Sequence, residues 1–133
     1  YRIGTYIFND RSLVENKICS EKMVALTVLA TVVSTPTKNR AIIDAGSKVL
    51  TSDLFGMNDH GSIVNYPELR ITQLTEEHGT IVSEQNTNLV IGQKIEIIPN
   101  HACVVMNMLN EVNLITEEKK IKKVKVIARG KVW

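Results

Sequence analysis

The chain has 133 residues, enough for one domain with a hydrophobic core, and its formal net charge is only +2 with 5% aromatic residues. This balance excludes the strong basic footprint of a nucleic-acid-binding protein. No apolar run approaches the ~20 residues of a membrane span, and no secretory signal pattern is present. Two cysteines are too few for a disulfide framework, so we expect a cytoplasmic protein with reduced thiols. A single disulfide between Cys19 and Cys103 is the alternative.

The first third of the chain is rich in Val, Ile and Thr, which favours β structure. Asp10 is placed to N-cap a short helix that runs through Asn16. We expect strands on either side of it, over residues 2–8, 24–34 and 40–44, with a turn over residues 36–39. Because the chain opens at Tyr1 without a methionine, we expect it to be a fragment or a processed product of a longer protein.

The remaining two thirds alternate between turns and short apolar runs. Residues 47–67 contain many glycine, asparagine and aspartate residues and predict a long loop, in which His60 is expected to be exposed. The predicted strands cover residues 70–76, 80–84, 92–98, 112–115 and 121–128, and the last two are expected to finish the sheet. We expect Met106 and Met108 to be core residues. The fold class is therefore mostly β: a single β-barrel or sandwich-like domain with at most short helices.

The segment with the clearest chemistry is Pro99-Asn100-His101-Ala102-Cys103. If it is extended, His101 and Cys103 lie on one face with Cα atoms ~6.5–7 Å apart. An imidazole and a thiolate together suit zinc, and two protein ligands leave positions open for water or substrate. The alternative is a buried structural thiol beside a satisfied histidine, because cysteine is among the most buried residue types.

Several motifs in one order point to a family. They are Gly4-Thr5-Tyr6-Ile7-Phe8-Asn9-Asp10, Ala25-Leu26-Thr27-Val28, Asp44-Ala45-Gly46-Ser47-Lys48, Glu77-His78-Gly79 and the His-x-Cys segment. Together they resemble the C-terminal part of the D-serine dehydratase and D-threonine aldolase family, fold-type III enzymes that use pyridoxal phosphate (PLP) and a divalent metal. The resemblance implies that residues 1–10 are the tail of a missing PLP-binding barrel and that residues 11–133 form the C-terminal β domain.

The resemblance also implies roles for individual residues. His101 and Cys103 would be the metal ligands, with zinc favoured by the cysteine. Gly4, Thr5 and Tyr6 would help to hold the PLP phosphate, although a plain turn with a core tyrosine is the alternative. His78 would be a proton-transfer group, or simply the polar tip of a hairpin.

The implied reaction is the action of a lyase on β-hydroxy D-amino acids, with PLP as the electron sink and the metal as a Lewis acid on the β-hydroxyl. Dehydration is expected, and retro-aldol cleavage of the D-threonine aldolase type is the alternative. The family's Schiff-base lysine has no counterpart here, and Lys48 does not match it, so the chain alone should be inactive. The N-terminal PLP barrel of the parent protein and a homodimer of the full-length enzyme are the expected partners. A stand-alone β-domain binding module without catalysis is a further alternative.

Overall fold

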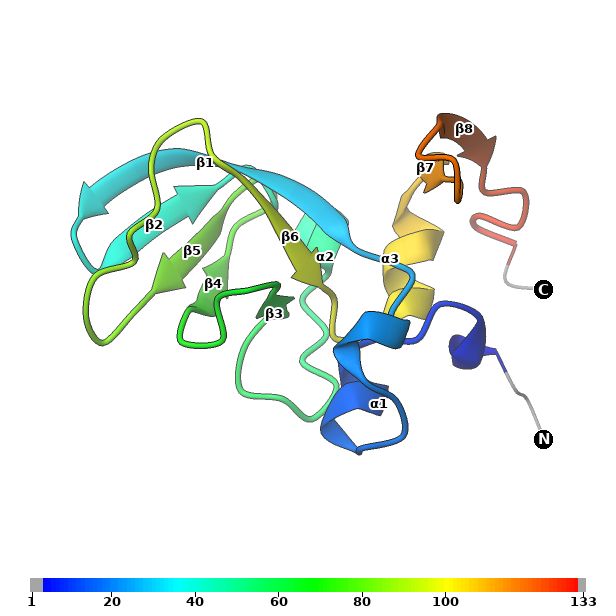
Figure 1. The fold of residues 1–133 in the computed structure, drawn as a ribbon, viewed down its shortest axis with the longest axis horizontal. Helices are drawn as coiled ribbons and strands as arrows, with labels where there is room; N and C mark the ends of the chain where they lie inside the picture. The colour runs from blue at the N-terminus through cyan, green and yellow to red at the C-terminus, as the bar shows by residue number, and fades with distance from the viewer. Residues whose placement is uncertain (1–3, 132–133) are drawn as a thin grey trace.

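The computed structural model describes residues 4–131, and most of its strands form one curved, nearly closed antiparallel sheet (Figure 1). The strand order is β3-β6-β1-β2-β5-β4. The strands are β1 (Val28–Thr37), β2 (Arg40–Ile43), β3 (Ser62–Ile63), β4 (Arg70–Leu74), β5 (Gly79–Val82) and β6 (Lys94–Ile98). The two outer strands, β3 and β4, lie against each other, and the His60 N–H donates to the Ile71 carbonyl at 3.0 Å. This closure confirms the predicted barrel-like β domain.

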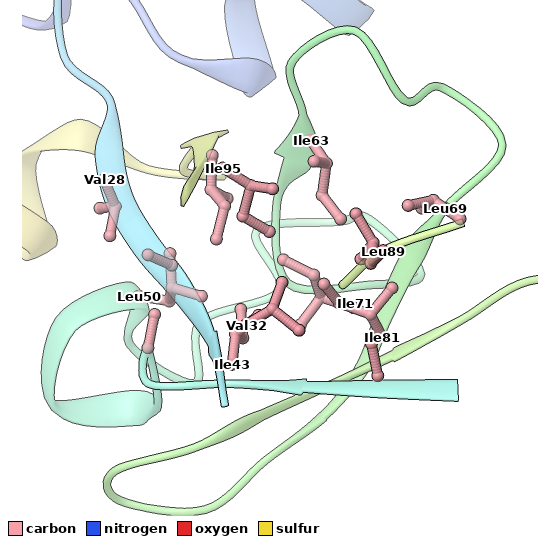
Figure 2. Packing of buried hydrophobic residues seen from close by; sticks show 14 of the residues in the cluster. Val28, Val32, Ile43, Leu50, Ile63, Leu69, Ile71, Ile81, Leu89 and Ile95 are labelled. Atoms are coloured by element: carbon pink, nitrogen blue, oxygen red, sulfur yellow. The ribbon is translucent and has the colours of Figure 1, made fainter. Parts of the chain in front are cut away.

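The core fills the inside of this curved sheet (Figure 2). Side chains alternate along β1, where Val28, Ala30 and Val32 are buried while Leu29 points outward. This period of two is the one that puts every second residue on the same face of a strand. The other five strands of the sheet supply most of the remaining buried aliphatic side chains of this core: Ala41, Ile43, Ile63, Ile71, Ile81, Ile95 and Ile97.

Short helices and one separate hairpin lie beside the barrel (Figure 1). The helices are α1 (Arg11–Glu15), α2 (Ser47–Leu50), α3 (Ala102–Met108) and the 3-10 turns η1 (Thr5–Ile7) and η2 (Glu21–Met23). The hairpin comprises β7 (Glu111–Ile115) and β8 (Ile121–Lys125), which pair only with each other in the described chain. The prediction that these two strands finish the main sheet is wrong, since β3 and β4 already meet at its edges.

Four other expectations change. The predicted strand over residues 2–8 is the turn η1 from Thr5 onward, and its first two residues lie outside the described part. Strand β1 begins at Val28 and ends at Thr37, so the predicted turn over residues 36–39 is confined to residues 38–39. The predicted long loop contains α2 and β3. Met108 is 42% exposed, so it is not a core residue.

Helix α2 docks onto the tip of the β4–β5 hairpin through backbone contacts. The Ser47 N–H donates to the Thr75 carbonyl at 2.8 Å, and the Lys48 N–H donates to that of Glu76 at 3.2 Å. A Cβ at Gly46 would lie 2.4 Å from the Glu76 carbonyl oxygen, so only glycine permits this approach. No helix among residues 4–131 is long and apolar enough to cross a membrane.

Candidate metal centre

The two predicted metal ligands lie at the start of a helix and not in a strand. His101 is the N-cap of α3, with extended backbone angles (φ −139°, ψ 106°), and Cys103 is the second helical residue. The expectation that residues 99–103 form an extended strand is therefore wrong, and the side-chain alignment derived from it is lost. Both residues nevertheless lie outside the core, since Cys103 is exposed and His101 is half-buried.

A single buried carboxylate explains why the chain turns into a helix here. Asp10 is fully buried, and one of its oxygens accepts the Ala102 N–H at 2.9 Å, in the first turn of α3. The other oxygen accepts the Leu13 N–H at 3.3 Å and the Ser12 hydroxyl at 2.5 Å, which confirms Asp10 as the N-cap of α1. One side chain thus accepts hydrogen bonds from N–H groups at the starts of two helices. The candidate site is thereby fixed relative to α1.

His101 is held on two sides by the loop that follows α2. The His101 Nδ1 lies 3.4 Å from the Asp53 Oδ2. The ring of Phe55 stacks on the imidazole, with centroids 4.2 Å apart and an interplanar angle of 25°. The His101 side chain is 21% exposed. The loop therefore restricts both the tilt of the ring and the position of its Nδ1.

The loop is itself anchored by Asn100. The Asn100 amide donates to the carbonyls of Asp59 at 2.7 Å and Leu54 at 3.2 Å, and its oxygen accepts from Arg11 at 3.3 Å. The buried Asp59 carboxylate forms ion pairs with Arg11 and, at 3.1 Å, with Arg70. Buried polar groups are costly unless they are paired, and here the contacts of Asp59 and Leu54 join the loop to α1, to β4 and to the segment after β6.

Cys103 lies beside the N-terminal segment. The Sγ is 3.6 Å from the Oγ1 of Thr5, one of the residues predicted to hold the PLP phosphate. Both cysteines are free, so the disulfide left open by the sequence is not formed. Gly4 has a negative φ (−133°) and a Cβ there would meet nothing within 4 Å, while Tyr6 is 60% exposed. The role of Gly4, Thr5 and Tyr6 in phosphate binding stays a prediction.

The other two histidines lie apart from this site. His78 is exposed in the turn between β4 and β5, where its backbone exchanges hydrogen bonds with Thr75. Its role in proton transfer stays a prediction. His60 is half-buried, contrary to the expectation of an exposed residue, and its Nδ1 has no partner among the described residues. Burial lowers the pKa of His60 below its usual value of 6.5, against the opposing charge of Asp59.

The donor chemistry at the start of α3 fits a zinc ion in part. An imidazole nitrogen and a thiolate sulfur are both preferred zinc ligands. Among residues 4–131, however, no group of three or more His, Cys, Asp or Glu side chains is placed to hold a metal. His101 and Cys103 would therefore supply two ligands, and the remaining positions would be filled from outside this part of the chain or by solvent.

The residues do not fit PLP attachment. A Schiff-base lysine is activated by removal from water. Every lysine of the described chain is exposed, and Lys48 forms a surface ion pair with Glu77. The described chain thus holds donors for a metal but no lysine suited to the cofactor.

Sequence reasoning missed the residues that hold His101. Asp53 and Phe55 belong to the long loop, and nothing in their spacing connects them with His101, which lies 48 positions after Asp53. The presence of a long polar loop in a small domain was the one signal, because such loops often carry function.

Comparison with known proteins gives the family. The profile of the putative serine dehydratase domain matches residues 25–115. A D-serine dehydratase of Dictyostelium discoideum is 33% identical over 132 residues, which cover 89% of this chain and 33% of the enzyme. An uncharacterised protein of Mycobacterium tuberculosis is 34% identical over 131 residues, which cover 94% of this chain and 98% of that protein.

A solved structure agrees with the sequence matches. The D-threonine aldolase of Filomicrobium marinum superposes with a TM-score of 0.81 and 27% identity, covering 98% of this chain and 36% of the enzyme. The chain thus spans about a third of the two enzymes and nearly the whole of the mycobacterial protein. With more than half of its length inside the matched profile, the chain belongs to the putative serine dehydratase domain family.

Proposed function

We propose that this chain is the C-terminal, metal-binding domain of a PLP-dependent lyase that acts on β-hydroxy D-amino acids, with dehydration as the reaction. His101 and Cys103 would be two of the zinc ligands. The proposal is supported by the family match and by the D-serine dehydratase relative, of which the chain covers one third. The rest of such an enzyme would carry the PLP barrel and its lysine, and the full-length protein would form a homodimer.

The observation that carries the proposal is the placement of these two donors. Both lie outside the hydrophobic core, at the start of α3, and Cys103 contacts Thr5 in the segment predicted to end the barrel. A catalytic metal needs exposed ligands and open positions, whereas a structural thiol is usually buried. The exposed Cys103 therefore favours the metal ligand over the core thiol.

The chemistry divides between the two parts of the proposed enzyme. Zinc, when bound, would act as a Lewis acid on the β-hydroxyl of the substrate. His101 and Cys103 would bind and orient the ion, while Phe55 and Asp53 would keep the imidazole in place. In this arrangement the chain contributes the metal ligands, and the PLP lysine comes from the rest of the enzyme.

Two alternatives have specific support. Retro-aldol cleavage is favoured by the likeness to a D-threonine aldolase, because the same metal site would serve that reaction. A stand-alone module is favoured by the mycobacterial relative, which has nearly the same length as this domain. The zinc experiment below separates both lyase alternatives from a module without a metal.

The test is zinc binding to the chain itself, measured by calorimetric titration under reducing conditions. We expect one zinc ion per chain, bound weakly because residues 4–131 supply only two ligands, and we expect His101→Ala and Cys103→Ala to remove binding without changing the circular dichroism spectrum. Cys19→Ala is the matched control, since it deletes the other thiol and should leave binding unchanged. Equal zinc affinity in the Cys103→Ala variant and the unaltered chain would contradict the proposal.

A further inference from the structure

The loop contact on His101 involves both oxygens of one carboxylate. Asp53 Oδ1 accepts the Phe55 backbone N–H at 3.0 Å, and Asp53 Oδ2 faces the His101 Nδ1 at 3.4 Å. The first contact fixes the carboxylate relative to its own loop. The second therefore has a defined direction, and the carboxylate is not a freely rotating surface charge, although its side chain is 42% exposed.

The position of Phe55 supports the same arrangement. Its φ is +48°, in the left-handed region that non-glycine residues rarely adopt. This conformation accompanies the stacking of the Phe55 ring on the imidazole at 4.2 Å. The carbonyl of the intervening Leu54 accepts from the buried Asn100 amide, so the loop is anchored next to the histidine that it contacts.

From this geometry we propose that Asp53 is a positioning residue that keeps the proton of neutral His101 on Nδ1 and leaves Nε2 free to bind the metal. An ionised carboxylate can only accept hydrogen bonds, so the His101 atom that faces it must be the donor. A neutral imidazole carries one N–H, and the other nitrogen is then an acceptor with a lone pair. The stacked Phe55 limits the tilt of the ring while Nδ1 faces Asp53.

This inference deepens the proposed function and rests on it only for the identity of the ligand. The placement of the proton is a property of the metal-free chain. Zinc binding then adds a separate readout, because partners that orient a ligating histidine typically contribute 10–100-fold to metal affinity.

The first experiment is 15N NMR of the histidine side chains in the metal-free chain at pH 8.5, where an ordinary imidazole is neutral. We expect the Nδ1–H form for His101. In Asp53→Asn the single amide oxygen should stay with the Phe55 N–H, and the amide NH2 should then donate to the His101 Nδ1. The proton should move to Nε2, which inverts the pattern of the 15N signals from the two ring nitrogens of His101. Exposed His78 is the internal control, and Glu84→Ala, which also removes one exposed negative charge, should change nothing.

The second experiment measures zinc affinity in the same variants. We expect Asp53→Asn and Asp53→Ala to weaken binding by roughly 10–100-fold while the circular dichroism spectrum is unchanged. An Nε2–H form in the unaltered chain, or an unchanged pattern in Asp53→Asn, would overturn the proposal. Unchanged zinc affinity beside an inverted pattern would overturn its metal-directed part. If the unaltered chain binds no zinc but the pattern inverts, the positioning role holds and the proposed function fails.

Discussion

The buried Asp10 carboxylate offers the sharpest test of how this fold is held together. Asp10→Ala would leave the Ala102 N–H at the start of α3 without its acceptor, and at the start of α1 it would remove the side-chain acceptor of the Leu13 N–H, which keeps the Asp10 backbone carbonyl at 3.2 Å. Losing an N-cap acceptor costs about 0.5–2 kcal/mol at each helix. Two caps together, with the lost bond from the Ser12 hydroxyl, give an expected loss of about 3 kcal/mol in the free energy of unfolding.

Urea unfolding followed by circular dichroism measures this loss. The transition midpoint should fall while the slope m stays constant, since the surface exposed on unfolding is the same. Asp44→Ala is the matched control. It removes an exposed carboxylate that accepts the Thr31 backbone N–H at 2.6 Å, and we expect a loss below about 1 kcal/mol. Equal losses in the two variants would refute the idea that Asp10 stabilises two helices at once.

Asp10→Asn refines the prediction. The amide keeps one acceptor oxygen, so it can cap one helix, but its NH2 group would then face the N–H of the other. We expect the free energy of unfolding to fall by at least half as much as in Asp10→Ala, about 1.5 kcal/mol or more. The reason is that the buried amide NH2 group and the helix N–H are both donors and cannot pair. A fully stable Asp10→Asn variant would show that only one of the two caps matters.

Three further outcomes are expected. Gly46→Ala should lower the free energy of unfolding by about 1–3 kcal/mol, because its Cβ would meet the Glu76 carbonyl, whereas Gly4→Ala should leave it unchanged; similar urea midpoints of the two variants would contradict this. Because burial lowers the pKa of His60, the unfolded chain takes up its proton first as the pH falls below 6.5. Stability should therefore fall from pH 7.5 to 5.5, and less so in His60→Gln; equal slopes would argue against it. Supplied with PLP and zinc, the chain alone should release no ammonia from D-serine in a coupled assay. Turnover would contradict the expectation that the chain lacks the Schiff-base lysine.

Local patterns determined much of the fold. The apolar, β-branched run over residues 24–34 predicts β1, and the paired runs around His78 predict the β4–β5 hairpin, because such residues favour strands. The N-cap at Asp10 could also be recognised, since capping depends on residues only three positions apart. The choice of His101 and Cys103 as candidates likewise came from residue chemistry alone, and their role as ligands stays a proposal.

Other features depend on contacts between distant residues. The sequence around His101 is compatible with a strand, and the two valines at positions 104 and 105 favour one. It is helical in the structure, where Asp10, 92 positions earlier, accepts the Ala102 N–H. The carboxylate that faces His101 comes from a loop 48 positions away. The sequence therefore determined the strands and the chemistry of the donors, whereas tertiary contacts decided the conformation and surroundings of the candidate site, because hydrogen bonds across the fold outweigh weak local preferences.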